Sequence, residues 1–83
     1  MDKRIDSVLL IVNKGKRESP VMVDNIRSYL EKRHIEVTVI GFDDNPAVLN
    51  SKEFDLAFSL GGDGTVLYSA RILADRNLPI LAV

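Results

Sequence analysis

Four short runs of apolar residues divide the chain, and each is typical of a β-strand. Residues 7–13 (SVLLIVN) and 78–83 (LPILAV) are almost continuously apolar, which is typical of strands covered on both faces in a parallel sheet. Residues 55–60 (DLAFSL) form another run. In residues 35–40 (IEVTVI) the apolar side chains alternate with Glu36 and Thr38, which predicts an edge strand with one wet face.

Helical patterns separate these strands. Ser19 and Pro20 suit the cap and first turn of a helix that we expect to continue to about Arg33. One face of this helix is apolar and consists of Val23, Ile26 and Leu30.

Two further helical segments follow along the chain. Pro46 predicts a short helical turn, capped by Asp44 or Asn45. The last helix is expected from about Gly64 to Arg76, and we expect it to bury Val66, Leu67, Ala70, Leu73 and Ala74.

The alternation of strands and helices predicts an α/β fold. We expect one three-layer, Rossmann-like domain over residues 1–83, with a parallel sheet in the order 2-1-3-4. The fourth strand would then lie at the sheet edge. Its apolar residues from Ile80 to Val83 predict association with another chain, or fraying.

Composition narrows the possible functions only a little. The chain has 83 residues, a formal charge of −1 and no cysteine. The charge gives no reason to expect nucleic acid or an anionic membrane as a partner, and the absence of cysteine excludes disulfides, a thiol nucleophile and zinc–thiolate sites in this chain. No apolar run is long enough for a signal peptide or a membrane span, which predicts a cytoplasmic protein.

The segment from Gly61 to Thr65 (GGDGT) carries the strongest functional signal. It leaves a predicted strand and opens a predicted helix, where free backbone N–H groups and the helix dipole favour a phosphate group. Asp63 is out of place in a purely phosphate-binding turn because a carboxylate repels phosphate. It therefore indicates a base that accepts a proton from a hydroxyl during phosphoryl transfer, or, alternatively, a simple helix cap.

Residues 58–73 (FSLGGDGTVLYSARIL), followed by LPILAV, resemble the NAD kinases. The GGDGT motif is shared with diacylglycerol and sphingosine kinases, but the VLYSAR continuation favours the NAD kinases. The resemblance implies ATP-dependent phosphorylation of the 2′-hydroxyl on the adenosine ribose of NAD. Asp63 would be the catalytic acid–base residue and would bind the ribose hydroxyl, Gly64 would contact NAD, and the phosphates would face Gly61, Gly62 and Thr65.

The resemblance also implies partners and cofactors. NAD would be the substrate and ATP the phosphoryl donor, with a divalent metal such as Mg²⁺, in an intact enzyme that is a homo-oligomer without nucleic acid or membrane partners. NAD kinases continue beyond the position of Val83 into a second domain, so the chain would be the amino-terminal half of a two-domain kinase and inactive alone. A diacylglycerol-type lipid kinase and a non-catalytic nucleotide-binding domain remain alternatives.

Other polar residues have ordinary explanations beside functional ones. Lys14, Lys16 and Arg17 could neutralise nucleotide phosphates or form a solvated loop. Tyr68 stands where many NAD kinases have a basic residue, so no phosphate contact is expected from it. Asp43, Asp44 and Asn45 lack the spacing of a metal-binding loop, and His34 suits the end of a helix rather than a ligand site.

Overall fold

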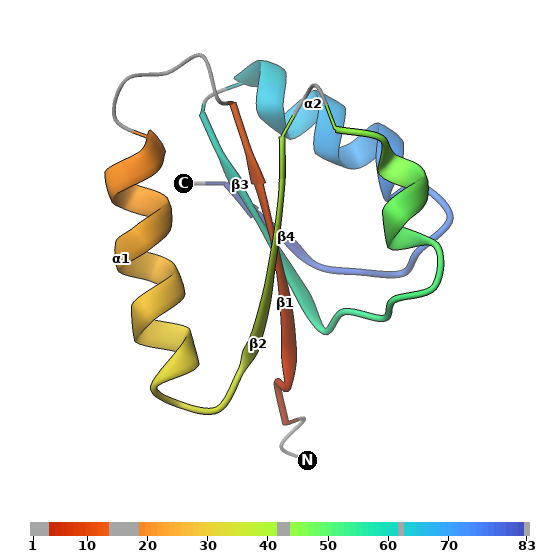
Figure 1. The fold of residues 1–83 in the computed structure, drawn as a ribbon. Coiled ribbons are helices and arrows are strands. Elements are labelled where there is room, and N and C mark those ends of the chain that lie inside the picture. Colours follow the sequence, from red (N-terminus) through yellow and green to blue (C-terminus); the bar gives the residue numbers. More distant parts are fainter. Residues whose placement is uncertain (1–3, 14–18, 42–43, 62, 83) are drawn as a thin grey trace.

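A parallel sheet with the strand order β2-β1-β3-β4 forms the centre of the protein, as the sequence predicts. The computed structural model describes residues 4–13, 19–41, 44–61 and 63–82. The strands are β1 (Ser7–Val12), β2 (Glu36–Gly41), β3 (Leu56–Leu60) and β4 (Ile80–Ala82). They alternate with α1 (Ser19–Glu31), the 3₁₀ helix η1 (Pro46–Leu49) and α2 (Asp63–Ile72) (Figure 1).

The strand β1 is the centre of the core. It pairs in parallel with β2 on one side and with β3 on the other, and its residues Val8 to Val12 are buried. Continuous burial explains why the strand is apolar from Val8 to Val12, since both of its faces are covered there.

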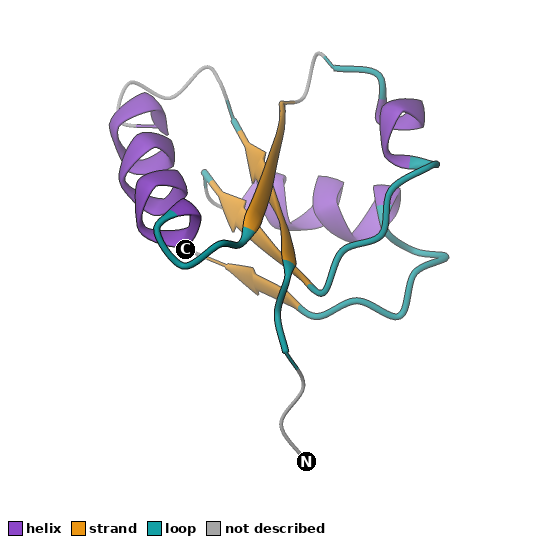
Figure 2. Ribbon diagram, turned by 60° about the horizontal axis from the view of Figure 1, so that its bottom comes forward, coloured by secondary structure: helices purple, strands orange, loops and turns teal. Residues whose placement is uncertain are grey.

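Helices cover the two faces of the sheet unequally (Figures 1 and 2). The helix α1 packs on one face against β2 and β1, whereas α2 packs on the other face against β3, β1 and β4. The main hydrophobic cluster lies on the α2 face and is built on these buried residues: Leu9, Ile11, Ile40, Leu49, Ala57 and Leu73.

The helix α1 ends in a turn that satisfies its last carbonyl groups. The backbone N–H of His34 donates to Glu31 O at 3.0 Å and that of Ile35 donates to Leu30 O at 3.1 Å, the pattern of a Schellman motif. His34 takes the left-handed conformation that this motif needs, with a φ of 63°. The exposed histidine is thus at the end of the helix, as predicted.

The edge strand β2 differs from its predicted pattern. Glu36 is exposed, but Thr38 is half-buried and Ile40, on the same face of the strand, is buried in the main cluster. The prediction of one wet face is therefore wrong, because Ile40 at the carboxyl end of that face packs with Leu49 of η1 in the main cluster.

Two side chains fix the connection between β2 and β3. Asn45 caps η1, and its Oδ1 accepts a hydrogen bond from Ala47 N at 3.0 Å. Asp44 Oδ2 accepts from Gly41 N at 2.7 Å and so closes the turn after β2. Asn45 is thus a helix cap, Asp44 closes a turn, and Asp43 lies outside the described residues.

The helix α2 is shorter and turned differently from the prediction. It ends at Ile72, and of the five residues expected inside only Leu73 is buried and Val66 half-buried. The other three, Leu67, Ala70 and Ala74, are exposed, while Thr65 and Ser69 are buried instead. The prediction was wrong because the helix carries apolar residues at positions all around its axis. The periodicity of its sequence therefore could not distinguish the buried face from the exposed face.

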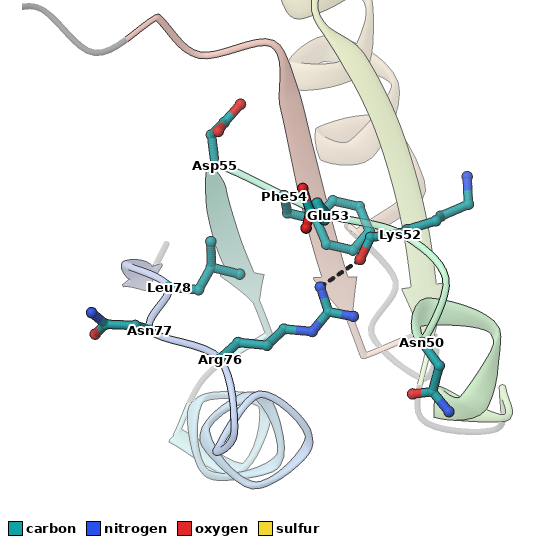
Figure 3. Close-up of a pocket in the computed structure, with 8 residues that line it drawn as sticks. All are labelled: Asn50, Lys52, Glu53, Phe54, Asp55, Arg76, Asn77 and Leu78. Atoms are coloured by element: carbon teal, nitrogen blue, oxygen red, sulfur yellow. Dashed lines mark hydrogen bonds between the residues drawn. The ribbon is translucent and has the colours of Figure 1, made fainter.

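Arg76 connects the end of α2 to the chain before β3 (Figure 3). Its guanidinium Nη1 donates to Lys52 O at 2.7 Å, its Nη2 donates to Leu49 O, and the group stands 5.5 Å from the centre of the Phe54 ring. Arg76, Lys52 and Phe54 help to line a hollow of about 470 Å³. The hollow lies at the amino edge of the sheet, whereas the GGDGT segment lies at the carboxyl edge. Because Arg76 already uses its donors on carbonyl groups, we interpret it as a structural clamp.

Removing this clamp should destabilise the chain. We expect Arg76→Ala to lower the free energy of unfolding by about 1–2 kcal/mol, since two carbonyl groups lose a charged donor. Arg76→Lys should recover only part of the loss because an ammonium group cannot span both carbonyls as the planar guanidinium does. Urea unfolding measures the difference, with exposed Arg71→Ala as the control. Equal stability of the two alanine variants would contradict the clamp.

Candidate nucleotide site at the carboxyl edge of the sheet

The GGDGT segment lies where the strand order reverses. The strands β1 and β3 are neighbours, although the chain passes through β2 between them, and the backbone N–H of Asn13 donates to Leu60 O at 3.1 Å where both strands end. In open α/β sheets, ligands bind beyond the carboxyl ends of the strands at such a switch point. The strand order therefore puts the predicted motif at the expected ligand position.

Gly61 is required at the first position of the turn. Its φ is +133°, a conformation that residues with a side chain rarely adopt. A Cβ atom added here would lie 2.7 Å from Asn13 Cβ and 2.8 Å from Thr65 Oγ1. The glycine thus lets the turn pass between the end of β1 and the first turn of α2.

The first turn of α2 begins at Asp63 and points its free backbone N–H groups towards this edge. Gly64 is exposed, and a Cβ atom added to it would meet no atom within 4 Å. The surface beside Gly64 is therefore open to a ligand. Gly62 and the side chain of Asp63 lie outside the described part of the structure, so their predicted roles stay predictions.

Buried hydroxyl groups lie under the turn. Thr65 and Ser69 of α2 and Ser59 of β3 are almost completely buried, and Ser69 Oγ donates to Thr65 O at 2.7 Å. The hydroxyl groups of Thr65 and Ser59 have no hydrogen-bond partner among the described residues. A buried hydroxyl without a partner is costly, so each one in a native protein calls for an explanation, of which a functional role is one.

Two further predictions concern Tyr68 and the basic residues that follow β1. Tyr68 is half-buried and packs against the main hydrophobic cluster, so its ring is part of the core. Lys14, Lys16 and Arg17 belong to the segment after β1 that lies outside the described residues, and their predicted phosphate contacts stay predictions.

Asn13 is a site residue that the sequence did not predict. It is the last residue of the first predicted strand, and its side chain occupies the space beside Gly61. A polar amide directly after a buried strand was the available signal. Its contact with a residue 48 positions later depends on the pairing of β1 with β3.

The described residues contain neither a cluster of metal ligands nor a membrane-spanning helix. No three or more His, Cys, Asp or Glu side chains among them gather closely enough to hold a metal ion. None of the helices in that part of the chain combines the length and the apolar character needed to cross a membrane.

Comparisons with known proteins give a consistent result. The chain is 35% identical to an NAD kinase of Treponema denticola over 78 aligned positions, covering 92% of this chain and 27% of the relative. It is 37% identical to NAD kinase 1 of Thermosynechococcus vestitus over 86 positions, covering 96% and 28% of the two chains. For an NAD kinase of Nitratidesulfovibrio vulgaris the identity is 32% over 85 positions, covering 100% and 30%.

No protein-family model matches the chain. No solved structure matches it at a significant level either. The similarity to the three relatives nevertheless extends over nearly the whole chain, which spans less than a third of their length and matches their amino-terminal part. The chain belongs to the NAD kinase family, in which it corresponds to the amino-terminal 25–30% of its relatives.

Proposed function

We propose that the chain is the phosphate-binding and proton-accepting part of an ATP-dependent NAD kinase. The observation that carries the proposal is the position of GGDGT at the switch point between β1 and β3, within a chain related to NAD kinases. The relatives described above are named NAD kinases. We therefore propose that the phosphoryl group is transferred to the ribose of NAD rather than to diacylglycerol.

In the proposed reaction Asp63 accepts the proton of the ribose 2′-hydroxyl. The hydroxyl oxygen forms a bond to the γ-phosphorus of ATP, and the bond from that phosphorus to the β–γ bridging oxygen breaks, so that ADP leaves and NADP forms. The backbone N–H groups at the start of α2 would bind phosphate oxygens, and the open surface beside Gly64 would admit the nucleotide. The buried hydroxyl of Thr65 lies beside the turn and would be available to hydrogen-bond to it or to a bound ligand.

A divalent cation would neutralise charge on the transferring phosphate. The described residues offer no cluster of ligands for it. We therefore assign the cation to the phosphates of ATP. Cytoplasmic location and homo-oligomeric assembly of the whole enzyme likewise remain part of the proposal.

The isolated chain should be catalytically inactive, whereas a longer enzyme that contains it should be active. Phosphoryl transfer needs donor, cation and acceptor held together, and this chain provides only one wall of such a site. The test compares the 83-residue chain with a joined enzyme, in which this chain replaces the matching amino-terminal part of the T. denticola relative. We expect NADP formation from NAD and ATP only in the joined enzyme.

Three other results would contradict the proposal. NADP production by the purified chain alone would disprove its inactivity. A joined enzyme that phosphorylates diacylglycerol and not NAD would support the lipid kinase alternative. A joined enzyme that unfolds cooperatively and binds NAD saturably, but forms no NADP, would support a non-catalytic nucleotide-binding domain. Calorimetric titration with NAD separates this last case from simple misfolding.

A further inference from the structure

A hollow beside α1 leaves part of the sheet without cover. We call it the α1 groove; its volume is about 380 Å³, and it is lined by Asn25, Ile26, Tyr29, Leu30 and Phe58. Four of these residues belong to α1 and the fifth to β3, so the groove runs between the helix and the open half of the sheet. It lies on the face opposite α2.

The topology explains why this half of the face is open. On this face α1 packs against β1 and β2, while η1 and α2 lie on the other face (Figure 2). Phe58 of β3 and Leu81 of β4 are register partners in the parallel pair, so their side chains lie on the same face as the groove. Phe58 is only half-buried and Leu81 is 49% exposed.

Large apolar side chains are exposed around the α1 groove. Besides Leu81, Tyr29 is 57% exposed and Met22 is 37% exposed on the side of α1 that borders the groove. Strands of a parallel sheet are normally covered on both faces, and contiguous exposed apolar surface marks a place where something else packs.

The dimensions of the open surface fit one α-helix. Two neighbouring strands, β3 and β4, span about 10 Å across the sheet, and packed helices lie about 8–10 Å apart. A helix placed over β3 and β4 would therefore contact the sheet below it and α1 beside it. Arg33, whose guanidinium lies 3.9 Å from the centre of the Tyr29 ring, would offer a cation to an acidic residue at one end of such a helix.

We propose that the α1 groove holds an amphipathic helix from the same polypeptide, supplied by the region that follows the matched segment in the longer relatives. This inference rests on family membership, not on the proposed reaction. The chain covers only 27–30% of three relatives, so each has a long remainder that can supply the helix. A second copy fits less well, because a stable interface between proteins takes about 20–30 residues a side and five line the groove.

The test uses single cysteines, which the chain itself lacks. Tyr29→Cys places a thiol in the α1 groove, and Leu81→Cys places one beside it on β4. Both side chains are exposed enough for the variants to fold. Ser28→Cys is the matched control, because Ser28 is exposed on the opposite side of α1. Thiol-labelling rates are measured in the isolated chain and in the joined enzyme, whose other cysteines are replaced.

We expect both groove positions to react quickly in the isolated chain. In the joined enzyme they should react more slowly, by about tenfold or more, because the covering helix must first open locally. The control position should react equally in both proteins. A photo-crosslinker attached at position 29 of the Tyr29→Cys variant should join it to one helical segment of the added region.

Other outcomes would overturn the inference. Equal labelling of Tyr29→Cys in both proteins would mean that the added region does not cover the groove. Protection in the isolated chain that increases with its concentration would assign the groove to a second copy. These measurements do not require NADP formation, so a joined enzyme without kinase activity would leave this test valid while contradicting the proposed function.

Discussion

Replacing Asp63 with asparagine in the joined enzyme should lower kcat by about a hundredfold or more, the usual effect of losing a positioned base. Asparagine keeps the size and shape of the side chain but cannot accept the ribose proton at neutral pH. The substitution should hardly change stability, because asparagine and aspartate serve about equally well at the start of a helix. Only a loss of up to about 1 kcal/mol is expected from removing a negative charge near the helix dipole.

Steady-state kinetics with NAD and ATP measure this effect, together with thermal unfolding of the same samples. Asp24→Asn, which changes an exposed carboxylate on α1, is the matched control and should leave kcat unchanged. A fall in kcat with little change in KM would indicate that Asp63 acts mainly in the transition state. Near-normal NADP formation by Asp63→Asn would remove the residue from the proposed chemistry.

The sheet was predictable because its strands are defined by local patterns. Continuous burial of β1 follows from its unbroken apolar run, and the order β2-β1-β3-β4 is one of the few that right-handed crossovers between parallel strands allow. The position of the glycine segment then follows as well, since a motif that leaves β3 must lie at the carboxyl edge of the sheet.

The helix α2 could not be predicted to the same depth. Its sequence places apolar residues on every side, and the structure buries Thr65 and Ser69 while leaving Leu67 73% exposed. The helix packs against β3 and begins beside the tight Gly61 turn, where the buried Thr65 lies next to the glycine. The pattern of apolar positions cannot show which face of α2 is buried, because that face depends on the direction in which the helix leaves the Gly61 turn.

Contacts between distant segments were the other unpredictable part. Asn13 contacts Gly61, and Arg76 donates to the carbonyl groups of Leu49 and Lys52, yet neither Asn13 nor Arg76 belongs to a recognisable sequence motif. Each contact depends on the pairing of the strands and on the position of α2 in the fold. The residue types allow these contacts, but the fold selects the partners.

Gly61 should be the most sensitive position for the stability of the described fold. Gly61→Ala brings a methyl group within 2.7 Å of Asn13 Cβ and 2.8 Å of Thr65 Oγ1. Neither neighbour can withdraw easily, because the Asn13 backbone is bonded to Leu60 O and Thr65 is completely buried. Overpacking of this kind costs about 1–3 kcal/mol, and a side chain at a φ of +133° adds strain of about 1–3 kcal/mol.

The matched control is Gly64→Ala in the same turn. A methyl group at Gly64 meets no atom within 4 Å, and the residue is helical, so the alanine variant should be as stable as the parent or more stable by up to about 1 kcal/mol. Urea unfolding of the 83-residue chain compares the two variants. In the joined enzyme Gly64→Ala should instead raise the KM for NAD, because the added methyl group occupies the open surface where the nucleotide is proposed to bind. If Gly61→Ala and Gly64→Ala prove equally stable, the close approach of Asn13 and Thr65 to Gly61 cannot be what holds the turn in place.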